Sequence, residues 1–163
     1  MKSYKVYDNF LKRSEFLKIK TVLESWNFPW YFQPTINLNH SYDDLDCYFT
    51  HNIFNQELGR SSSFDLVAPI LNKLNIKSLI RVKCNLYPRT DNININKPHT
   101  DFNFKHKGAI FYINTNDGGT IMKDKSKVDS VENRLLIFEP HHEHSSTTTS
   151  NKKCRININF NYF

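Results

Sequence analysis

The first part of the chain has the apolar spacing of helices. Between residues 14 and 26 apolar side chains recur every three or four positions, and Ser14 stands where an N-cap residue would begin such a helix. The predicted apolar face consists of Phe16, Ile19, Val22, Leu23 and Trp26. A second helical pattern starts near Ser63, and Pro69 lies inside it, where an interior proline would kink a helix. We therefore predict two helices before residue 78.

Strand patterning occupies two other segments of this region and most of the chain after it. Residues 30–36 and 47–54 are rich in aromatic and β-branched side chains, which favour strands. In 80–87 and 155–162 apolar and polar residues alternate, so each predicted strand has one apolar and one polar face. The polar faces are candidates for a binding site.

Two further strands are predicted at 109–113 and 135–138. Both are apolar on both faces, which is typical of central strands covered from two sides. Asp117-Gly118-Gly119 has the composition of a hairpin turn, and we expect it to join the first of these strands to residues 120–122. Helices followed by about eight short strands predict an α+β protein with a β-sandwich or barrel core.

The length of 163 residues corresponds to about one domain. We expect a single domain over 1–163, in which 1–77 supports the core and 78–163 supplies the core strands. The longest uncharged apolar runs are a few residues long, whereas a bilayer span needs roughly 20 residues. The N-terminus also lacks an apolar signal segment. The expected location is therefore the cytoplasm, with no membrane partner.

Composition adds a modest positive charge of +6 and a pI near 9.2, which favour anionic partners. Lys and Arg are scattered along the chain, so we expect a soluble basic surface rather than a dedicated nucleic-acid interface. Cys47, Cys84 and Cys154 are odd in number and lack CxxC spacing. That pattern disfavours a disulfide framework and a cysteine zinc site, and predicts buried thiols.

Candidate chemistry begins with His99-Thr-Asp101, whose two side chains project to the same side of an extended segment and could share a metal ion. Further along, His141, His142 and His144 follow the predicted strand 135–138, and Arg155 opens the last strand. Two histidines and one carboxylate on one face of an iron ion form the facial triad of non-haem Fe(II) oxygenases. Their co-substrate 2-oxoglutarate has a distal carboxylate, for which arginine is the bidentate partner.

These residues carry a family resemblance over roughly 78–163. The motifs, in order, are Asn85-x-Tyr87, His99-x-Asp101, His144 and Arg155-x-Asn157. Together they resemble the Fe(II)/2-oxoglutarate-dependent dioxygenase superfamily. The segment 133–138, a histidine six residues after it and the closing Arg-Ile-Asn-Ile-Asn run are similar to small phage and marine bacterial oxygenases of the prolyl 4-hydroxylase type. The resemblance implies a double-stranded β-helix supported by N-terminal helices, and is compatible with a phage-encoded enzyme.

The resemblance also implies a role for each site residue. His99, Asp101 and His144 would bind Fe(II), with His144 preferred to His141 or His142 by its distance from the neighbouring motifs. Arg155 would bind the distal carboxylate of 2-oxoglutarate, and Tyr87 would hydrogen-bond the co-substrate. Two weaker co-substrate candidates are Asn85 and Tyr112. The implied reaction consumes O2, yields succinate and CO2, and hydroxylates an aliphatic carbon of a prolyl or other protein side chain.

Several alternatives stay open from the sequence. Asn85-x-Tyr87 also resembles the nucleic-acid demethylase branch, but that branch has a second arginine six residues after the first, where this chain has Asn161. A small molecule such as a free amino acid is another candidate substrate. Outside the superfamily, the chain could be a non-enzymatic, basic nucleic-acid-binding β domain or a zinc-binding β-sandwich. The sequence gives no indication of the oligomeric state.

Some polar residues receive no role in this interpretation. We expect His141 and His142 to lie in a solvated loop after Pro140. Asn157, Asn159 and Asn161 are attributed to a composition with 20 asparagines. The segment 91–97 is interpreted either as a lid over the iron or as an ordinary surface loop. The remaining histidines, His40, His51 and His106, are treated as ordinary.

Overall fold

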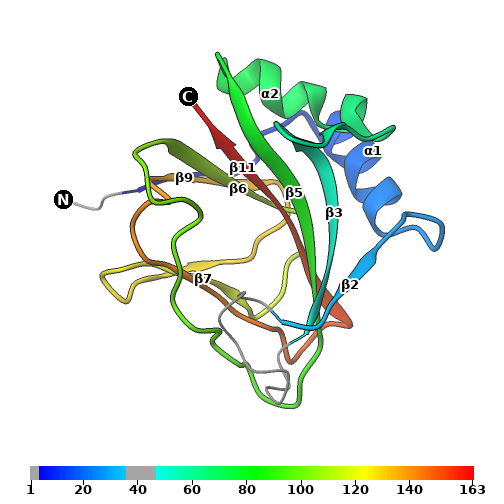
Figure 1. Ribbon diagram of the computed structural model, residues 1–163. Helices are drawn as coiled ribbons and strands as arrows, with labels where there is room; N and C mark the ends of the chain where they lie inside the picture. The colour runs from blue at the N-terminus through cyan, green and yellow to red at the C-terminus, as the bar shows by residue number, and fades with distance from the viewer. Residues whose placement is uncertain (1–3, 36–46) are drawn as a thin grey trace.

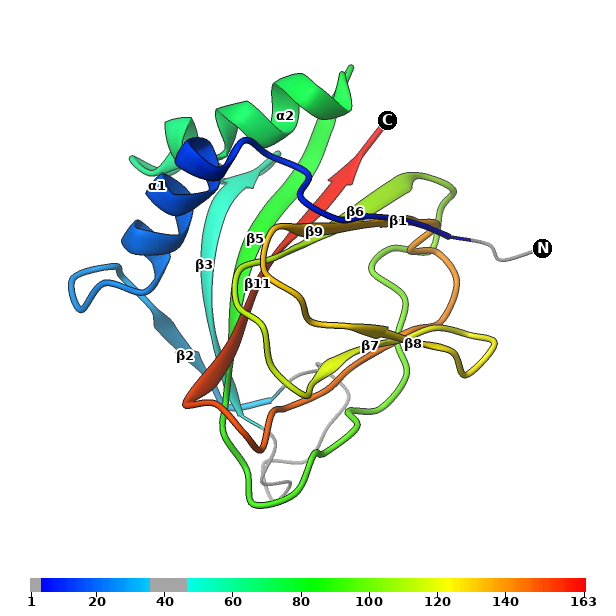
Figure 2. The same cartoon turned by 180° about the vertical axis from the view of Figure 1, so that it is seen from behind.

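Two antiparallel sheets face each other in the computed structural model, which describes residues 4–35 and 47–163 (Figures 1 and 2). The larger sheet has the order β1 (Lys5–Tyr7), β9 (Arg134–Phe138), β6 (Lys107–Tyr112), β11 (Cys154–Tyr162), β5 (Leu79–Pro88), β3 (Tyr48–Asn55) and β2 (Tyr31–Gln33), with β4 (Gly59–Arg60) paired to β3. The smaller sheet has the order β10 (Ser145–Ser146), β7 (Gly119–Ile121) and β8 (Lys127–Asp129). The predicted α+β class and the double-stranded β-helix core are confirmed.

Single bridges extend the smaller sheet beyond β10, to the segment 95–99. Ile95 pairs with Thr147, and His99 pairs with His144, both in antiparallel orientation. The main-chain N–H of His99 donates to the carbonyl of His144 and the reverse bond is also made, each at 3.0 Å. This pairing brings two candidate ligands together although they are far apart in the sequence.

The first helix, α1 (Arg13–Leu23), buries Phe16, Ile19 and Leu23 as predicted. Its predicted cap is wrong, because Lys12 is the N-cap and its main-chain N–H donates to the Glu15 carboxylate at 3.3 Å. An acidic side chain three positions into the helix therefore closes the first turn. The assignments of Val22 and Trp26 to the buried face are also wrong. Val22 lies within the helix but is 40% exposed. The helix ends before Trp26, whose side chain is 97% exposed.

The second helical region consists of a 3-10 turn, Phe64–Val67, followed by α2 (Ala68–Leu74). Pro69 lies in the first turn of α2, where the missing N–H has no intrahelical partner to lose. The predicted kink is therefore absent. The helix ends at Asn75, whose left-handed φ of 51° is a common way to terminate a helix.

Both helices cover the outer face of the larger sheet (Figures 1 and 2). The apolar face of β5 and β11 packs toward them, with Val82, Cys84, Ile156, Ile158 and Phe160 buried in the same cluster as the helix side chains. A second apolar cluster involves strands of both sheets. Its buried members are Ile110, Tyr112, Met122, Val128, Leu136 and Phe138. Because apolar packing uses the outer face of β5 and β11, the polar residues of these strands point between the sheets.

The predicted hairpin at Asp117-Gly118-Gly119 is wrong. Strand β6 pairs with β11 and β9, whereas β7 pairs with β8 and β10. The intervening residues thus carry the chain from the larger to the smaller sheet. A Cβ atom at Gly118 would collide with the carbonyl oxygen of Thr148 and lie 2.9 Å from Cδ of Arg155. Glycine is needed here for the close approach of the crossing segment.

The prediction of buried thiols is right for Cys84 and wrong for Cys47 and Cys154, which are partly exposed. No helix in the described part of the chain is long and apolar enough to cross a membrane. The predicted strand 30–36 is shorter in the structure, where it is β2, and its last predicted residue lies outside the described residues, as does His40.

Candidate functional site

Three candidate metal ligands meet between the two sheets. The ligand atoms of His99, Asp101 and His144 all lie within 4.8 Å of one another. Oδ1 of Asp101 is 3.8 Å from Nε2 of His99 and 3.9 Å from Nε2 of His144. Asp101 and His144 have side chains only 4% exposed, whereas His99 is 27% exposed. The trio therefore faces an opening on the side of His99.

Four groups hold Asp101 in place. Its Oδ2 accepts hydrogen bonds from Nδ2 of Asn159 at 3.0 Å and of Asn161 at 2.8 Å. Its Oδ1 lies 3.3 Å from the Arg81 guanidinium, and its main-chain N–H donates to the carbonyl of Pro140. Burial acts to raise the pKa of this carboxyl, but His144, Arg81 and the two amides outweigh it and lower the pKa well below its usual range. The charged form, which binds metals, is thus favoured.

The two histidines differ in what fixes them. Nδ1 of His144 lies 3.1 Å from the carbonyl oxygen of His142, so a proton on Nδ1 leaves the Nε2 lone pair directed toward Asp101. For His99, burial and the neighbouring His144 lower the pKa to about 4. Its imidazole is therefore neutral at physiological pH. Two imidazoles and one carboxylate form the donor set expected for a divalent transition metal.

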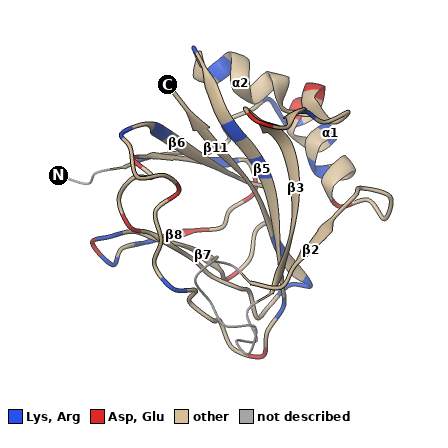
Figure 3. Cartoon of the chain, viewed as in Figure 1, with Lys and Arg blue, Asp and Glu red and all other residues tan. Residues whose placement is uncertain are grey.

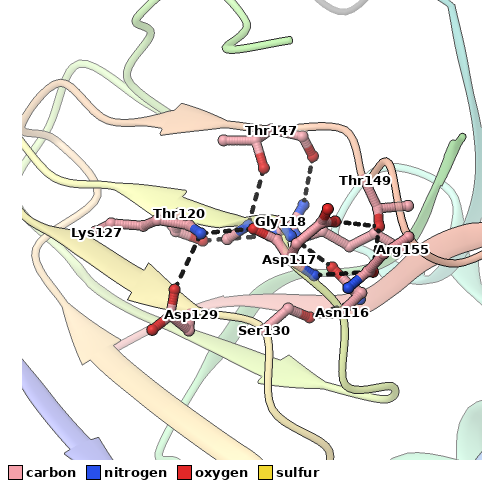
Figure 4. A network of polar contacts seen from close by, with 12 residues as sticks. Asn116, Asp117, Gly118, Thr120, Lys127, Asp129, Ser130, Thr147, Thr149 and Arg155 are labelled. Atoms are coloured by element: carbon pink, nitrogen blue, oxygen red, sulfur yellow. Dashed lines mark hydrogen bonds and ion pairs between the residues drawn. The ribbon is translucent and has the colours of Figure 1, made fainter. Parts of the chain in front are cut away.

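Arg155 lies fully buried near the crossing segment (Figure 4). Its Nη1 donates to the carbonyl of Thr147 at 3.2 Å and its Nη2 to Oγ1 of Thr120 at 3.4 Å, while Nε has no hydrogen-bond partner. The guanidinium also packs on the rings of Tyr87 and Tyr112, 5.0 and 5.7 Å from their centroids. No carboxylate of the described residues forms an ion pair with it. Such a buried charge is costly unless an anion accompanies it.

A narrow pocket, lined mainly by polar residues, connects His99 and His144 with Arg155. Its cavity volume is only about 30 Å³. Its walls are formed by Asn85, Tyr87, His99, Ile110, Thr120, His144, Ser146, Arg155, Asn157 and Asn159. Two buried amide oxygens in this wall, Oδ1 of Asn85 and of Asn159, have no hydrogen-bond partner among the described residues. These unpaired polar groups suit a small polar ligand with an anionic group at the arginine end, and such a ligand would widen the pocket.

Two of the three other candidates for co-substrate binding, Asn85 and Tyr87, line this pocket. The Nδ2 group of Asn85 donates to Oδ1 of Asn157 at 3.0 Å. Tyr87 stacks on Tyr48 with their ring centroids 5.5 Å apart. Tyr112 does not line the pocket; it lies behind it, and its hydroxyl donates to Thr120 at 2.8 Å. Burial raises the pKa of both the Tyr87 and Tyr112 hydroxyls, so each keeps its proton.

Four residues that support Asp101 have no role in the sequence interpretation. Asn159 and Asn161 bind the carboxylate directly, so attributing them to composition alone is wrong. His106 fixes one of them, because its Nε2 lies 3.1 Å from Nδ2 of Asn161. Arg81 completes the set. The signal that could have found three of them is strand alternation, which places Arg81 on the face of Asn85 and both asparagines on the face of Arg155.

Lys83 lies between Arg81 and Asn85 on the same face of β5. Its Nζ donates to the hydroxyl of Tyr48 at 3.4 Å. Burial, reinforced by the charge of Arg81, lowers the pKa of this lysine to about 8. No carboxylate of the described residues pairs with Lys83, so it contributes a second positive charge to this side of the site.

The segment 91–97 is anchored to the smaller sheet. The main-chain N–H of Asn96 donates to the carbonyl of Ser146 at 2.9 Å, and that of Thr148 donates to the carbonyl of Asn94 at 3.0 Å. Asn96 also donates through its side chain to the hydroxyl of Ser146. These bonds favour a fixed strand-like wall over the alternative of a lid. His51, treated as ordinary, contacts Pro29 and Ser61 away from the site.

No family model and no curated protein matches the chain. Solved structures do. A prolyl hydroxylase from Trichoplax adhaerens, solved with a peptide of the hypoxia-inducible factor oxygen degradation domain, has 17% identity, a TM-score of 0.72, and coverage of 99% of this chain and 83% of that one. A Pseudomonas putida prolyl-4-hydroxylase has 13% identity, a TM-score of 0.63, and coverage of 98% and 92%.

A third similar structure is the non-heme α-ketoglutarate-dependent epimerase SnoN from nogalamycin biosynthesis. It has 13% identity and a TM-score of 0.68, with 99% of this chain and 77% of that chain covered. These likenesses establish that the chain has the fold of the 2-oxoglutarate oxygenases, and of prolyl hydroxylases among them. The same fold therefore serves hydroxylation and epimerisation.

Proposed function

We propose that this protein is an Fe(II)- and 2-oxoglutarate-dependent dioxygenase that hydroxylates an aliphatic carbon of a peptide, with a prolyl side chain as the first candidate. One observation carries the proposal. The pocket that begins at His99 and His144 ends at the buried guanidinium of Arg155, which has no carboxylate partner among the described residues. A ligand that chelates a metal at one end and presents a carboxylate at the other satisfies both ends.

The residues present are compatible with both groups. His99, Asp101 and His144 would hold Fe(II) and leave open positions for the co-substrate and O2. Arg155 would bind the distal carboxylate, and the hydroxyls of Thr120 and Tyr87 lie beside it. When bound, iron and 2-oxoglutarate would supply the oxidising chemistry, in which O2 is consumed, succinate and CO2 are formed, and a C–H bond is hydroxylated.

The protein's own contribution is positioning. Asn159 and Asn161 fix the carboxylate of Asp101, and the carbonyl of His142 fixes the ring of His144. Arg155 would orient the co-substrate, and the partly exposed side of His99 would leave room for substrate. Prearranged ligands lower the cost of reaching a reactive geometry.

The likeness to prolyl hydroxylases supports a peptide substrate, and one of these enzymes has been solved with a peptide. A nucleic-acid substrate has less support. Position 161, where the demethylase branch has its second arginine, holds a fully buried asparagine that is bonded to Asp101 and cannot reach a substrate. A small-molecule substrate is the second candidate, because the epimerase SnoN belongs to a biosynthetic pathway.

The test is an anaerobic titration of metal-free protein with Fe(II) and 2-oxoglutarate, followed by visible absorbance. We expect a metal-to-ligand charge-transfer band that is lost in His144→Ala and weakened in Arg155→Ala. Glu57→Gln, which changes an exposed carboxylate in the turn between β3 and β4, should leave the band unchanged. Peptides that contain proline would then be screened for stimulated succinate formation. The absence of a band at saturating iron and co-substrate would overturn the proposal.

A further inference from the structure

A second group of potential metal ligands lies on the turn that follows β9. Within residues 4–35 and 47–163, Glu139, His141 and His142 are one of two groups of three whose ligand atoms all lie within 4.8 Å of one another. Oε2 of Glu139 is 3.7 Å from Nε2 of His141 and 3.8 Å from Nδ1 of His142. Because the main-chain N–H of His142 donates to the carbonyl of Glu139, the turn itself holds the three side chains together.

The contacts of these side chains do not explain the cluster as a hydrogen-bonded structure. Both distances to the carboxylate exceed hydrogen-bond length. The two imidazole rings lie side by side, with their centroids 4.2 Å apart. A shared cation would bind the Glu139 carboxylate together with Nε2 of His141 and Nδ1 of His142.

We propose that Glu139, His141 and His142 form a second metal site, which binds one divalent ion of the zinc class. Two imidazoles and one carboxylate suit zinc, nickel or copper and do not suit magnesium or calcium, which prefer oxygen ligands. Tetrahedral zinc with bonds of about 2.1 Å places its ligand atoms roughly 3.4 Å apart. The two distances to Glu139, 3.7 and 3.8 Å, are close to this value, and all three ligand atoms lie within 4.8 Å of one another. The Glu139 and His142 side chains are 47% and 45% exposed, so water can complete the coordination.

The turn that carries this second site also supports the candidate iron site. The carbonyl of Pro140 accepts the main-chain N–H of Asp101 at 2.9 Å, and the carbonyl of His142 lies 3.1 Å from Nδ1 of His144. An ion bound by the side chains of the turn would therefore restrict the main-chain groups that orient two ligands of the first site. The two sites share a backbone but no ligand, so each can be removed without deleting the other.

The test counts zinc in untagged, metal-free protein after equilibration with Zn²⁺ and gel filtration. Wild-type protein should retain two equivalents, because the iron ligands also bind zinc. Asp101→Ala and the double variant His141→Ala/His142→Ala should each retain one, and the combination of all three substitutions none. Glu139→Gln should weaken zinc binding in the Asp101→Ala background, whereas Glu57→Gln should not.

Thermal unfolding gives a second measurement. Zinc should raise the unfolding temperature of Asp101→Ala protein, because a ligand that binds the folded state stabilises it. It should not raise the unfolding temperature of the variant that combines Asp101→Ala, His141→Ala and His142→Ala. Equal zinc contents in wild-type and His141→Ala/His142→Ala protein would overturn the second site. Equal contents in wild-type and Asp101→Ala protein would instead count against the iron site, so the two failures can be told apart.

Discussion

Nδ2 of Asn161 lies 2.8 Å from Oδ2 of Asp101 and 3.1 Å from Nε2 of His106. The asparagine thus connects a carboxylate at the start of the smaller sheet with a buried histidine, and does so from the last strand of the larger sheet. This bond from β11 fixes one orientation of the carboxylate. Groups that orient a metal ligand in this way tune the affinity of the metal itself.

Replacing Asn161 by alanine should therefore weaken metal binding by about 10- to 100-fold, because Asp101 loses one of its two amide donors. Mn²⁺ or Fe(II) titration of the metal-free variant measures this. Asn72→Ala, an exposed asparagine on α2, is the matched control and should bind metal like wild type. Unchanged affinity in Asn161→Ala would show that Asn159 and Arg81 suffice to orient the carboxylate.

A methyl group at Gly118 should disturb the pocket at its Arg155 end. Gly118→Ala pushes a new Cβ against the carbonyl of Thr148 and the Arg155 side chain, which should cost about 1–3 kcal/mol of stability and weaken 2-oxoglutarate binding more than iron binding. Urea unfolding and separate titrations with metal and co-substrate measure the three effects. Gly59→Ala is the comparison. It should also lose stability, because an L side chain is strained at a φ of 81°, but its methyl group enters open space and should leave 2-oxoglutarate binding unchanged.

Lys83 should make stability depend on pH on the alkaline side. Burial, with a further contribution from Arg81, lowers the pKa of this lysine to about 8 in the folded protein, against an ordinary value of 10.5. Between about pH 8 and 10.5 the unfolded chain binds more protons, so the free energy of unfolding should rise with pH in that window. Lys83→Met should raise stability at pH 7 and reduce this slope.

Urea unfolding of metal-free protein at several pH values measures the Lys83 effect. Lys18→Met, an exposed lysine on α1, should leave the slope as it is. A slope that survives in Lys83→Met would assign the pH dependence to another group.

The boundary of α1 can be tested by comparing two aromatic residues. Phe16 is completely buried, and Phe16→Ala should cost about 3–5 kcal/mol of stability. Trp26 is 97% exposed, and Trp26→Ala should change stability by less than about 0.5 kcal/mol. Circular dichroism during urea unfolding measures both. Comparable losses would mean that Trp26 packs against the protein in solution.

The fold was predictable where one periodicity extends along a whole element. Alternation in β5 and β11 correctly separates the helix-facing side from the site-facing side, because successive strand residues point to opposite faces. Pro69 and Asp117-Gly118-Gly119 were misinterpreted because their local signals fit two structures each. A proline is as suitable in a first helical turn as at a kink, and a Gly-Gly pair allows a crossing as well as a hairpin.

For the candidate site, spacing and residue type were enough to select His99, Asp101, His144 and Arg155, which the structure brings around one pocket. The supporting residues were harder to select. Asn161 and His106 have no motif of their own. Asn161 contacts Asp101, and His106 contacts Asn161, only because of the strand pairing in the larger sheet. Neither residue type reveals its partner before the strand register is known.

The reciprocal main-chain bonds between His99 and His144 have a dynamic consequence. The amide proton of each residue is hydrogen-bonded to the carbonyl of the other. A single local opening that separates the two residues should therefore expose both amides to solvent. Hydrogen exchange should therefore give the two amides nearly equal protection factors in the metal-free protein. An ion that joins the two side chains would clamp this edge of the smaller sheet and slow both rates together. Metal binding and local opening of this sheet edge are therefore coupled equilibria, because an ion that binds only the closed edge reduces the population of the open one.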